Sequence, residues 1–592
     1  IRSSTITGNS AENYGGGIAG GGPLLIYDST IHGNSAEYGG GIYGEPTAVN
    51  CTIDGNMARD GGAIYNHQGG TISIEASSLS GNTVTDSGGA IYARLTTISI
   101  SGSTLNNNSS NFNGGAIASE SGPLTIVDST LSGNEAHFGG GVYTTGSTFA
   151  LRGSTIHDNE AYFGGGLYLS VENPTIEGST ISGNRALYKD GAVQGSGGGI
   201  DFGGVVLTVR NSTVSGNVAT GHGGGIQTSF DSLVLLQHST VTLNIADADG
   251  DLIGRGGGVH QSGPPATDVE IELDHTIVAR NNLVNGARDD LFGGVRARHS
   301  LIGDNSGIGL FVNDGGNLIG TVLMPINPQL GPLADHGGPT RTHALLAGSP
   351  AIDAGDSMFN PADPDGDPMT DDALPFDQRG DPFLRVFDGN GTSGALIDMG
   401  AYELIPDDVV QALYGDYNRD GLIDAGDYVR WRNTLGTSGL DAYEAADGSG
   451  NGAVGIEDYA VWKPHYGAQV PVNPGGGGLP DVGLGAASLG LLSDDRQAES
   501  KSALPLHSLP RGESDVRRGP TVQPEALMSS SARRDAALAA WLAARDLRRD
   551  DLRGSDSNAG GGVEANDAGR SHRDAAFALL GADQPRPAVA AS

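Results

Sequence analysis

The residues best suited to metal chemistry lie between positions 416 and 427. Oxygen-bearing side chains occupy positions 1, 3, 5, 9 and 12 of this stretch, and they are Asp416, Asn418, Asp420, Asp424 and Asp427. Gly421 stands at position 6, where a metal-binding loop needs a sharp bend, and the backbone carbonyl of Leu422 follows at position 7. Because Ca²⁺ is a hard cation that takes oxygen ligands in loops of this spacing, the stretch predicts a calcium-binding loop.

A second copy of the pattern begins 31 residues later, at Asp447 instead of Asp416. Its ligand set is poorer because Gly455 stands at position 9, and we therefore expect weaker binding than in the first loop. Aromatic residues follow both loops, Tyr428 and Trp431 after the first and Tyr459 and Trp462 after the second. The first of these segments is expected to be the exiting helix, stopped by Gly436.

Together the two copies resemble a type I dockerin, in which aspartate closes each loop and no helix enters it. The resemblance assigns to a first Ca²⁺ Asp416, Asn418, Asp420, Leu422, Asp424 and Asp427, and to a second Asp447, Ser449, Asn451, Ala453 and Asp458. It implies Ca²⁺-dependent folding of residues 410–467 and a cohesin-like or cell-envelope partner. The family's association with polysaccharide-degrading systems favours a carbohydrate link. Two acidic turns without metal remain the alternative.

A different pattern, with a period near 25 residues, fills residues 1 to about 320. Each period has a Ser-Thr pair followed by an apolar residue, an asparagine three residues later, and a Gly-Gly pair leading to a second apolar residue. The asparagines are Asn9, Asn34, Asn56, Asn82, Asn108, Asn134, Asn159, Asn184, Asn217 and Asn244. Short β-prone pieces follow Gly-Gly and precede the next Ser-Thr, so three short strands are expected per period.

Three strands per period, each stacked on its counterpart in the next coil, predict a mainly β fold, a parallel β-helix. Apolar ladders would fill its axis. The asparagines would tolerate a left-handed backbone at the corner and stack their amides from coil to coil. The glycine pairs would allow positive φ and close approach of adjacent coils.

The repeats resemble the right-handed parallel β-helices of surface proteins, including those with polymorphic outer-membrane-protein type repeats. Gly62-Ala63-Ile64, Gly89-Ala90-Ile91 and Gly115-Ala116-Ile117 carry this resemblance. It implies a fold and leaves function open, because lyases, hydrolases and adhesins share this scaffold.

Two insertions interrupt the repeat at the same corner, between the asparagine and the glycine pair. We take them as a candidate ligand-binding corner, whose residues are Lys189, Asp190, Asp247, Asp249, Asp251 and Arg255. The insertions lie two coils apart, so they should project side by side on one face. The three aspartates suit Ca²⁺, and a solvated loop is the alternative.

Residues 321–405 carry a separate set of blocks, at 330–340, 342–345, 348–355, 377–380 and 398–403. These blocks resemble the choice-of-anchor Q domain, which ends β-helical surface proteins ahead of an attachment module. The resemblance implies a C-terminal cap, secretion and anchoring. Beyond it, residues 468–592 are expected to form a Gly/Pro linker and a largely disordered tail.

Composition narrows the class of partner. The formal net charge of −36 disfavours nucleic acid, whose phosphates would be repelled. No apolar run approaches the ~20 residues that cross a bilayer, so no transmembrane segment is expected. Cys51 has no second cysteine to pair with and is expected to be a small buried residue. Because Ile1 lies inside a repeat, we expect the signal peptide to be missing from this fragment.

Two functions remain open at this point. The first is a secreted or cell-surface β-helix, non-enzymatic, with an adhesive, glycan-binding or structural role, retained through the Ca²⁺-dependent module. The second is a lyase or glycoside hydrolase acting on extracellular polysaccharide. At the position immediately before the Ser-Thr pair, no two neighbouring coils both carry an acidic residue. Since such enzymes need clustered carboxylates in a groove, no catalytic residue is assigned.

Overall fold

The computed structural model describes residues 1–187, 189–190, 193–263, 268–346, 348–361, 374–387, 396–405, 417, 423–438, 446 and 453–467. The chain divides into two compact units, Ile1–Gly477 and Gly478–Ser592. All described residues belong to the first unit, so the expected linker and tail lie outside them. None of the helices in the described ranges has the length and apolarity needed to cross a bilayer.

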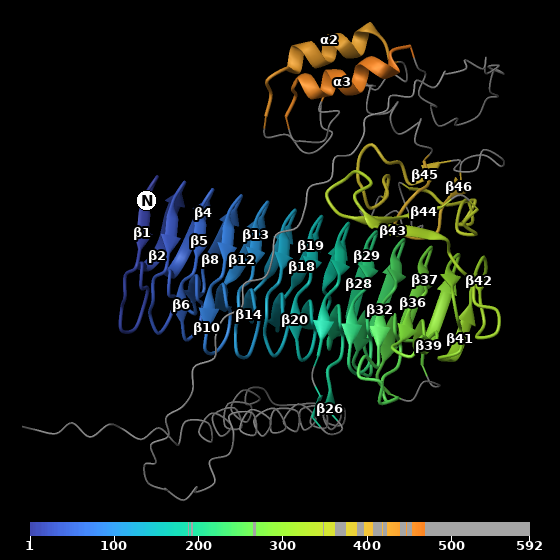
Figure 1. Cartoon of the computed structure of the whole chain (residues 1–592), viewed down its shortest axis with the longest axis horizontal. Coiled ribbons are helices and arrows are strands. Elements are labelled where there is room, and N and C mark those ends of the chain that lie inside the picture. Colours follow the sequence, from blue (N-terminus) through green and yellow to red (C-terminus); the bar gives the residue numbers. More distant parts are fainter. Residues whose placement is uncertain are drawn as a thin grey trace, which may run out of the picture. The chain divides into compact units, whose positions relative to one another are not determined.

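The repeats form a parallel β-helix, as predicted, with successive coils stacked side by side (Figure 1). One wall is a 13-stranded parallel sheet built from the Ser-Thr segments. Its strands are β1 (Thr5–Thr7), β3 (Thr30–His32), β5 (Thr52–Asp54), β9 (Ser78–Ser80), β13 (Thr104–Asn106), β16 (Thr130–Ser132), β19 (Thr155–His157), β23 (Thr180–Ser182), β29 (Thr213–Ser215), β33 (Thr240–Thr242), β37 (Ile277–Ala279), β40 (Leu301–Ile302) and β42 (Leu318–Ile319).

The other two predicted strand positions merge into one 20-stranded sheet. The strands after Gly-Gly are β7 (Ile64–Asn66), β11 (Ile91–Arg94), β14 (Ile117–Glu120), β17 (Val142–Thr145), β21 (Leu167–Ser170), β27 (Ile200–Phe202), β31 (Ile226–Thr228) and β35 (Val259–Gln261). Those before Ser-Thr are β8 (Thr71–Glu75), β12 (Thr97–Ser101), β15 (Leu124–Val127), β18 (Phe149–Arg152), β22 (Thr175–Glu177), β28 (Val206–Arg210), β32 (Leu233–Gln237) and β36 (Ile271–Asp274). The sheet also includes β2 (Ile18–Tyr27), β4 (Ile42–Val49), β39 (Leu291–Arg298) and β41 (Ile308–Asn313). In β2 and β4 a single strand covers both positions, the one after Gly-Gly and the one before Ser-Thr.

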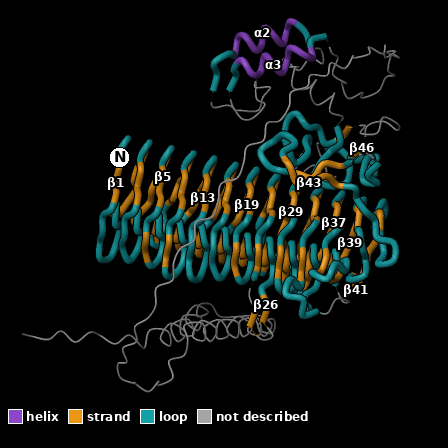
Figure 2. Tube along the Cα trace, in the orientation of Figure 1, coloured by secondary structure: helices purple, strands orange, loops and turns teal. Residues whose placement is uncertain are grey.

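Two-residue strands that the sequence did not predict follow the asparagine corner (Figure 2). They are β6 (Met57–Ala58), β10 (Thr83–Val84), β20 (Glu160–Ala161), β24 (Arg185–Ala186), β30 (Val218–Ala219), β34 (Ile245–Ala246) and β38 (Asn282–Leu283). One antiparallel hairpin, β25 (Lys189–Asp190) and β26 (Val193–Gln194), follows β24 in the chain, while β24 itself pairs with β30 and continues the row. Such short strands carry no periodicity of their own, which is why pattern reading missed them.

Equivalent positions of adjacent coils pair in register, Ile6 with Ile31 and Ile31 with Ile53. Their side chains point inward with those of the apolar residues after Gly-Gly, such as Ile42. Together they form one continuous core from Ile26 to Ile302. Cys51 is buried in this core, as expected.

The asparagines form the predicted amide ladder. Asn108 Nδ2 donates to Asn134 Oδ1 at 3.0 Å, and the same oxygen accepts the backbone N–H of Asn108 at 2.9 Å. Asn108 Nδ2 also donates to the Leu79 carbonyl at 3.0 Å. The expected left-handed backbone was wrong for these asparagines. It lies one residue earlier, at Gly133 (φ 63°), where glycine adopts a positive φ without steric cost.

The ladder ends on a different residue type. Asn281 Nδ2 donates to Asp290 Oδ1 at 2.9 Å, and the backbone N–H of Asn281 donates to the same oxygen at 2.7 Å. Burial raises the pKa of Asp290 to about 7, with Asn281 hydrogen bonds opposing the shift. An aspartate thus substitutes for asparagine where the regular repeat stops.

The described residues between 330 and 405 pack against the outer face of the 13-stranded sheet (Figure 1). Their strands are β43 (Leu330–Ala334), β44 (Thr342–Leu345), β45 (Val386–Phe387) and β46 (Leu396–Ile397), paired antiparallel. Gln378 reaches the threonine row of the sheet, since Thr213 Oγ1 donates to its Oε1 at 2.6 Å and its Nε2 donates to Thr180 Oγ1 at 2.9 Å. Apolar contacts with Ile277 and Leu301 complete the interface.

Replacing Asn108 by alanine should lower stability markedly. The change removes the acceptor of the Asn82 backbone N–H and the donor to the Leu79 carbonyl, and each buried group left unpaired costs about 1–3 kcal/mol. Thermal unfolding followed by circular dichroism should show a clear loss. Asn111→Ala is the matched control. Asn111 is exposed, and its side chain donates a hydrogen bond to the Thr85 carbonyl. Equal melting of both variants would contradict the role of the ladder.

Candidate functional site

The two C-terminal helices are built as a matched pair. Helices α2 (Ala425–Thr434) and α3 (Ile456–His465) each follow one of the predicted calcium loops. Asp427 Oδ2 accepts the Asp424 backbone N–H at 2.8 Å, and Asp458 Oδ2 accepts the Gly455 backbone N–H at 2.6 Å. Both of these helix carboxylates are fully buried.

The two halves also exchange tryptophan hydrogen bonds. Trp431 Nε1 donates to the Gly455 carbonyl at 2.7 Å, and Trp462 Nε1 donates to the Asp424 carbonyl at 3.2 Å. Gly455 and Asp424 both stand at position 9 of their loops, so each helix holds the loop of the other half. The shared core is Tyr417, Ile423, Trp431, Ala446, Val454 and Trp462. The sequence repeat therefore corresponds to a structural repeat in the described residues.

Of the ligands that the resemblance assigns, Asp424, Asp427, Ala453 and Asp458 are described. Asp416, Asn418, Asp420, Leu422, Asp447, Ser449 and Asn451 lie outside the described residues. The described donors fit calcium, because Asp427 and Asp458 place carboxylates fully inside the fold. Buried carboxylates are retained where they are paired or coordinate a metal, and oxygen ligands suit Ca²⁺.

At the candidate corner the structure brings the two insertions together. Lys189 and Asp190 form strand β25, and Gln194 at the end of β26 donates through Nε2 to Asp251 Oδ2. This contact confirms the expectation that the insertions lie close together on one face.

The three aspartates of the second insertion, Asp247, Asp249 and Asp251, each offer a carboxylate oxygen within 4.8 Å of the others. Arg255, the sixth predicted residue of this corner, makes its hydrogen bonds with Gly254 and His222. Its Nη1 donates to the Gly254 carbonyl at 2.9 Å, and its backbone N–H donates to His222 Nδ1 at 3.1 Å.

A row of histidines beneath the cap was missed from the sequence. His238, His275 and His299 occupy the slot before Ser-Thr in successive coils and stack at 4.8 and 5.2 Å between ring centroids. Their recurrence in one slot was the available signal. His238 and His275 also contact Phe359 of the cap region.

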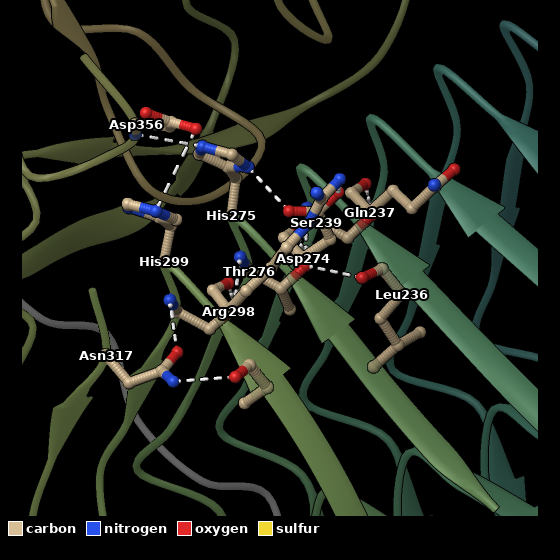
Figure 3. A network of polar contacts seen from close by, with 12 residues as sticks. Leu236, Gln237, Ser239, Asp274, His275, Thr276, Arg298, His299, Asn317 and Asp356 are labelled. Carbon is tan, nitrogen blue, oxygen red and sulfur yellow. Dashed lines mark hydrogen bonds and ion pairs between the residues drawn. The ribbon is translucent and has the colours of Figure 1, made fainter. Parts of the chain in front are cut away.

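The hydrogen bonds of His275 identify this row as a structural joint (Figure 3). Its Nε2 accepts the Asp356 backbone N–H at 3.0 Å, so Nδ1 carries the proton and donates to Asp274 Oδ1 at 2.7 Å. Arg298 Nη2 donates to Asp274 Oδ2 at 2.7 Å. Burial alone would raise the pKa of Asp274, but the hydrogen bonds from His275 and Arg298 hold it below the usual range. These bonds tie the cap to the coils, and a metal there would have to break them.

A cluster of tyrosines lies on the first four coils, and we call Tyr14, Tyr38, Tyr43, Tyr65 and Tyr92 the tyrosine cluster. It consists of two rows, one before the Gly-Gly pairs and one after them. Tyr43 and Tyr65 stack at 6.0 Å, and Tyr65 stacks on Tyr92 at 5.2 Å, so the ring faces of adjacent coils meet. Tyr14 contacts Tyr43 at 4.6 Å and is 46% exposed.

Polar groups border the tyrosine cluster. Gln68 Nε2 donates to the Tyr43 hydroxyl at 2.7 Å, and Arg59 Nη1 donates to the Tyr38 hydroxyl at 3.1 Å. Arg59 lies 3.8 Å from an oxygen of Asp60.

Arg59 also lies 3.5 Å from oxygens of Glu37 and Asp86. Burial, followed by the charge of Asp86, raises the pKa of Asp60 to about 7. No pattern in the sequence distinguished this aspartate, because its slot carries unrelated residues in other coils.

The comparisons with known proteins agree with the fold. The family model described as "Right handed beta helix region" matches residues 44–203. The comparisons with curated proteins and with solved structures gave no match. The match and the stacked parallel sheets together support a right-handed parallel β-helix.

The raised pKa of Asp60 predicts a pH effect on stability. The unfolded carboxyl ionises near pH 4, so the stabilisation from its folded, protonated form is complete below that pH and lost as the pH rises towards about 7. Asp60→Asn should flatten the decline of the melting temperature between pH 4 and 7.

Asp158→Asn is the control, because the Asp158 side chain is 72% exposed. If both variants follow the wild-type pH profile, Asp60 does not titrate as stated.

Proposed function

We propose that this chain is a secreted or cell-surface β-helix that binds an extracellular polysaccharide without cleaving it. Retention would come from the paired-helix module through Ca²⁺ and a cohesin-like or cell-envelope partner. The fold supports this proposal, because stacked coils present the same outer slot repeatedly, and a polymer has repeating groups to meet it.

The tyrosine cluster is the observation that carries the proposal. Tyrosine and arginine are the residue types enriched at binding surfaces, since each joins a broad apolar area to a polar tip. Here the half-buried Tyr38 and Tyr43 accept hydrogen bonds from Arg59 and Gln68 at their hydroxyls, so exposed hydroxyl, guanidinium and amide groups lie together. Such groups hydrogen-bond the hydroxyls and carboxylates of a polysaccharide. The stacked rings are already ordered, which lowers the entropic cost of binding.

The ion pairs of the β-helix support binding over cleavage. Arginines contact acids of the adjacent coil, with separations of 4.0 Å for Arg94–Glu120, 3.6 Å for Arg152–Glu177, 4.0 Å for Arg185–Glu160 and 3.4 Å for Arg296–Glu272. A glycosidase needs two carboxylates ~5–9.5 Å apart across the scissile bond. Acids engaged by arginines along the helix serve packing and charge balance instead.

One observation favours the second candidate, a polysaccharide lyase or glycoside hydrolase. Asp60 has a pKa of about 7 and lies beside Arg59, and a carboxyl that titrates near neutrality suits general acid–base chemistry. Asp86 contacts the same guanidinium. The tyrosine cluster would then bind the polymer next to these acids.

Binding should depend on the tyrosine cluster. The double variant Tyr38→Ala/Tyr43→Ala removes two rings of the cluster and the two hydroxyls that Arg59 and Gln68 hold in place, and a loss of ~1.4 kcal/mol or more corresponds to at least a tenfold weaker affinity. Calorimetric titration with pectin, alginate and xylan measures it.

Tyr27→Ala is the matched control, because Tyr27 lies outside the cluster and contacts Arg2. Equal affinity of the double variant and the control would contradict binding at the cluster. Release of cleaved product from any of the three polymers, lost in Asp60→Asn, would establish the enzymatic alternative.

The module should require Ca²⁺ for its stability. Removing the ion with EDTA leaves the buried Asp427 and Asp458 carboxylates without their cation, so residues 423–467 should lose their hydrogen-exchange protection. Adding Ca²⁺ should restore it, while peptides from residues 100–160 serve as an internal control. Unchanged exchange of the module in EDTA would show that it folds without metal.

A further inference from the structure

The corner where the two insertions meet has features that the proposed function does not use. Hairpin β25–β26 rises from one coil, and residues 247–255 form the insertion two coils further along the helix. They touch through Gln194 and Asp251. The carboxylates of Asp247, Asp249 and Asp251 converge to within 4.8 Å of one another. Three like charges this close repel, so the arrangement calls for a compensating positive charge.

Asp247 is the first sign that a ligand belongs here. Its side chain is fully buried, and its Oδ1 accepts the Leu252 backbone N–H at 2.9 Å. Its Oδ2 is also buried, with no hydrogen-bond partner within the described residues. A buried carboxylate oxygen left in this way is costly unless a cation neutralises it.

Gln194 is an independent sign, because it comes from the other insertion. It is only 8% exposed, and its amide lies against Asp251. Its Oε1 is buried and, in the described part of the chain, has no hydrogen-bond partner. The two ends of an amide differ little in shape, so a half-turn of the group exchanges Oε1 for the Nε2 that now contacts the carboxylate. This rotation would add a neutral oxygen to the three carboxylates.

The donor chemistry selects the ion. All four candidate donors are oxygens, with no sulfur or imidazole nitrogen among them, and hard oxygen ligands suit Ca²⁺. The guanidinium of Arg255, the cation of this insertion, donates its hydrogen bond to the Gly254 carbonyl. Mg²⁺ fits less well, because it keeps most of its water and demands a near-octahedral shell.

We propose that Asp247, Asp249, Asp251 and Gln194 form a Ca²⁺ site that clamps hairpin β25–β26 to the 247–255 loop. This site is separate from the paired-helix module and does not depend on the polysaccharide-binding proposal. Its consequence is local. The ion fixes two insertions that neither the core nor the asparagine ladder holds.

Hydrogen exchange of the full chain, with and without CaCl₂, tests the site because it resolves each region. Ca²⁺ at about ten times its dissociation constant should slow exchange about tenfold in peptides covering 187–196 and 245–256. Asp247→Asn keeps an oxygen for the Leu252 N–H but removes the charge, so this protection should disappear. Peptides from the module should still respond to Ca²⁺ in the variant.

Gln194→Ala is the second variant, and it should weaken the Ca²⁺ response of the same two peptides. Asp314→Asn is the matched control, since Asp314 is an acid that pairs with Arg296 away from this corner. MgCl₂ should protect the corner less than CaCl₂. The proposal is overturned if ~10 mM Ca²⁺, about ten times the weakest dissociation constants of extracellular calcium modules, leaves both corner peptides of the wild type unchanged. It is also overturned if Asp247→Asn keeps the full response.

Discussion

The stacking of one coil on the next is the constraint from which the other features follow. Each coil lies ~4.8 Å from its neighbours, set by backbone hydrogen bonds between parallel strands. The asparagine ladder continues those bonds around a corner, where regular strand pairing stops. The glycine pairs pack directly against this corner, since a Cβ on Gly41 would lie 3.3 Å from the Asn56 side chain. A Cβ on Gly40 would come within 2.4 Å of the Met57 carbonyl oxygen, so no larger residue fits there.

Fixed stacking turns single residues into rows, and the rows supply the surfaces of the regular repeat. Stacked rings make the tyrosine cluster, acids and arginines alternate as ion pairs along the coils, and stacked histidines anchor the cap. Variation within a slot is what distinguishes one part of the helix from another. The insertions at Gln194 and Asp251 break the rows, and there the fold depends on contacts outside the repeat.

The repeat could be predicted from sequence because each position in it meets one physical requirement. An apolar residue fills the axis, and an asparagine bonds the asparagine of the next coil. The left-handed residue was misplaced by one position, since asparagine and glycine both tolerate positive φ and only the geometry decides between Asn134 and Gly133. Coil spacing predicted that the insertions lie near each other on one face, and the structure adds their direct contact through Gln194 and Asp251.

The tyrosine cluster and Asp60 could not be foreseen. Their properties come mainly from neighbours one coil away, 21 or more residues distant in the chain, such as Tyr38 beside Arg59. The calcium loops show the opposite case, because their donors are local in sequence and readable as a pattern. There the structure adds the reciprocal hydrogen bonds of Trp431 and Trp462.

The central claim is that this rigid helix meets a polymer along the tyrosine cluster. Hydroxyl-radical footprinting of the full chain with and without saturating polysaccharide tests it most directly, because it reports side-chain cover without any substitution. We predict protection at Tyr14, Tyr38 and Tyr43, with Tyr27 unchanged. Protection spread evenly over the helix, or confined to coils beyond residue 180, would contradict the account.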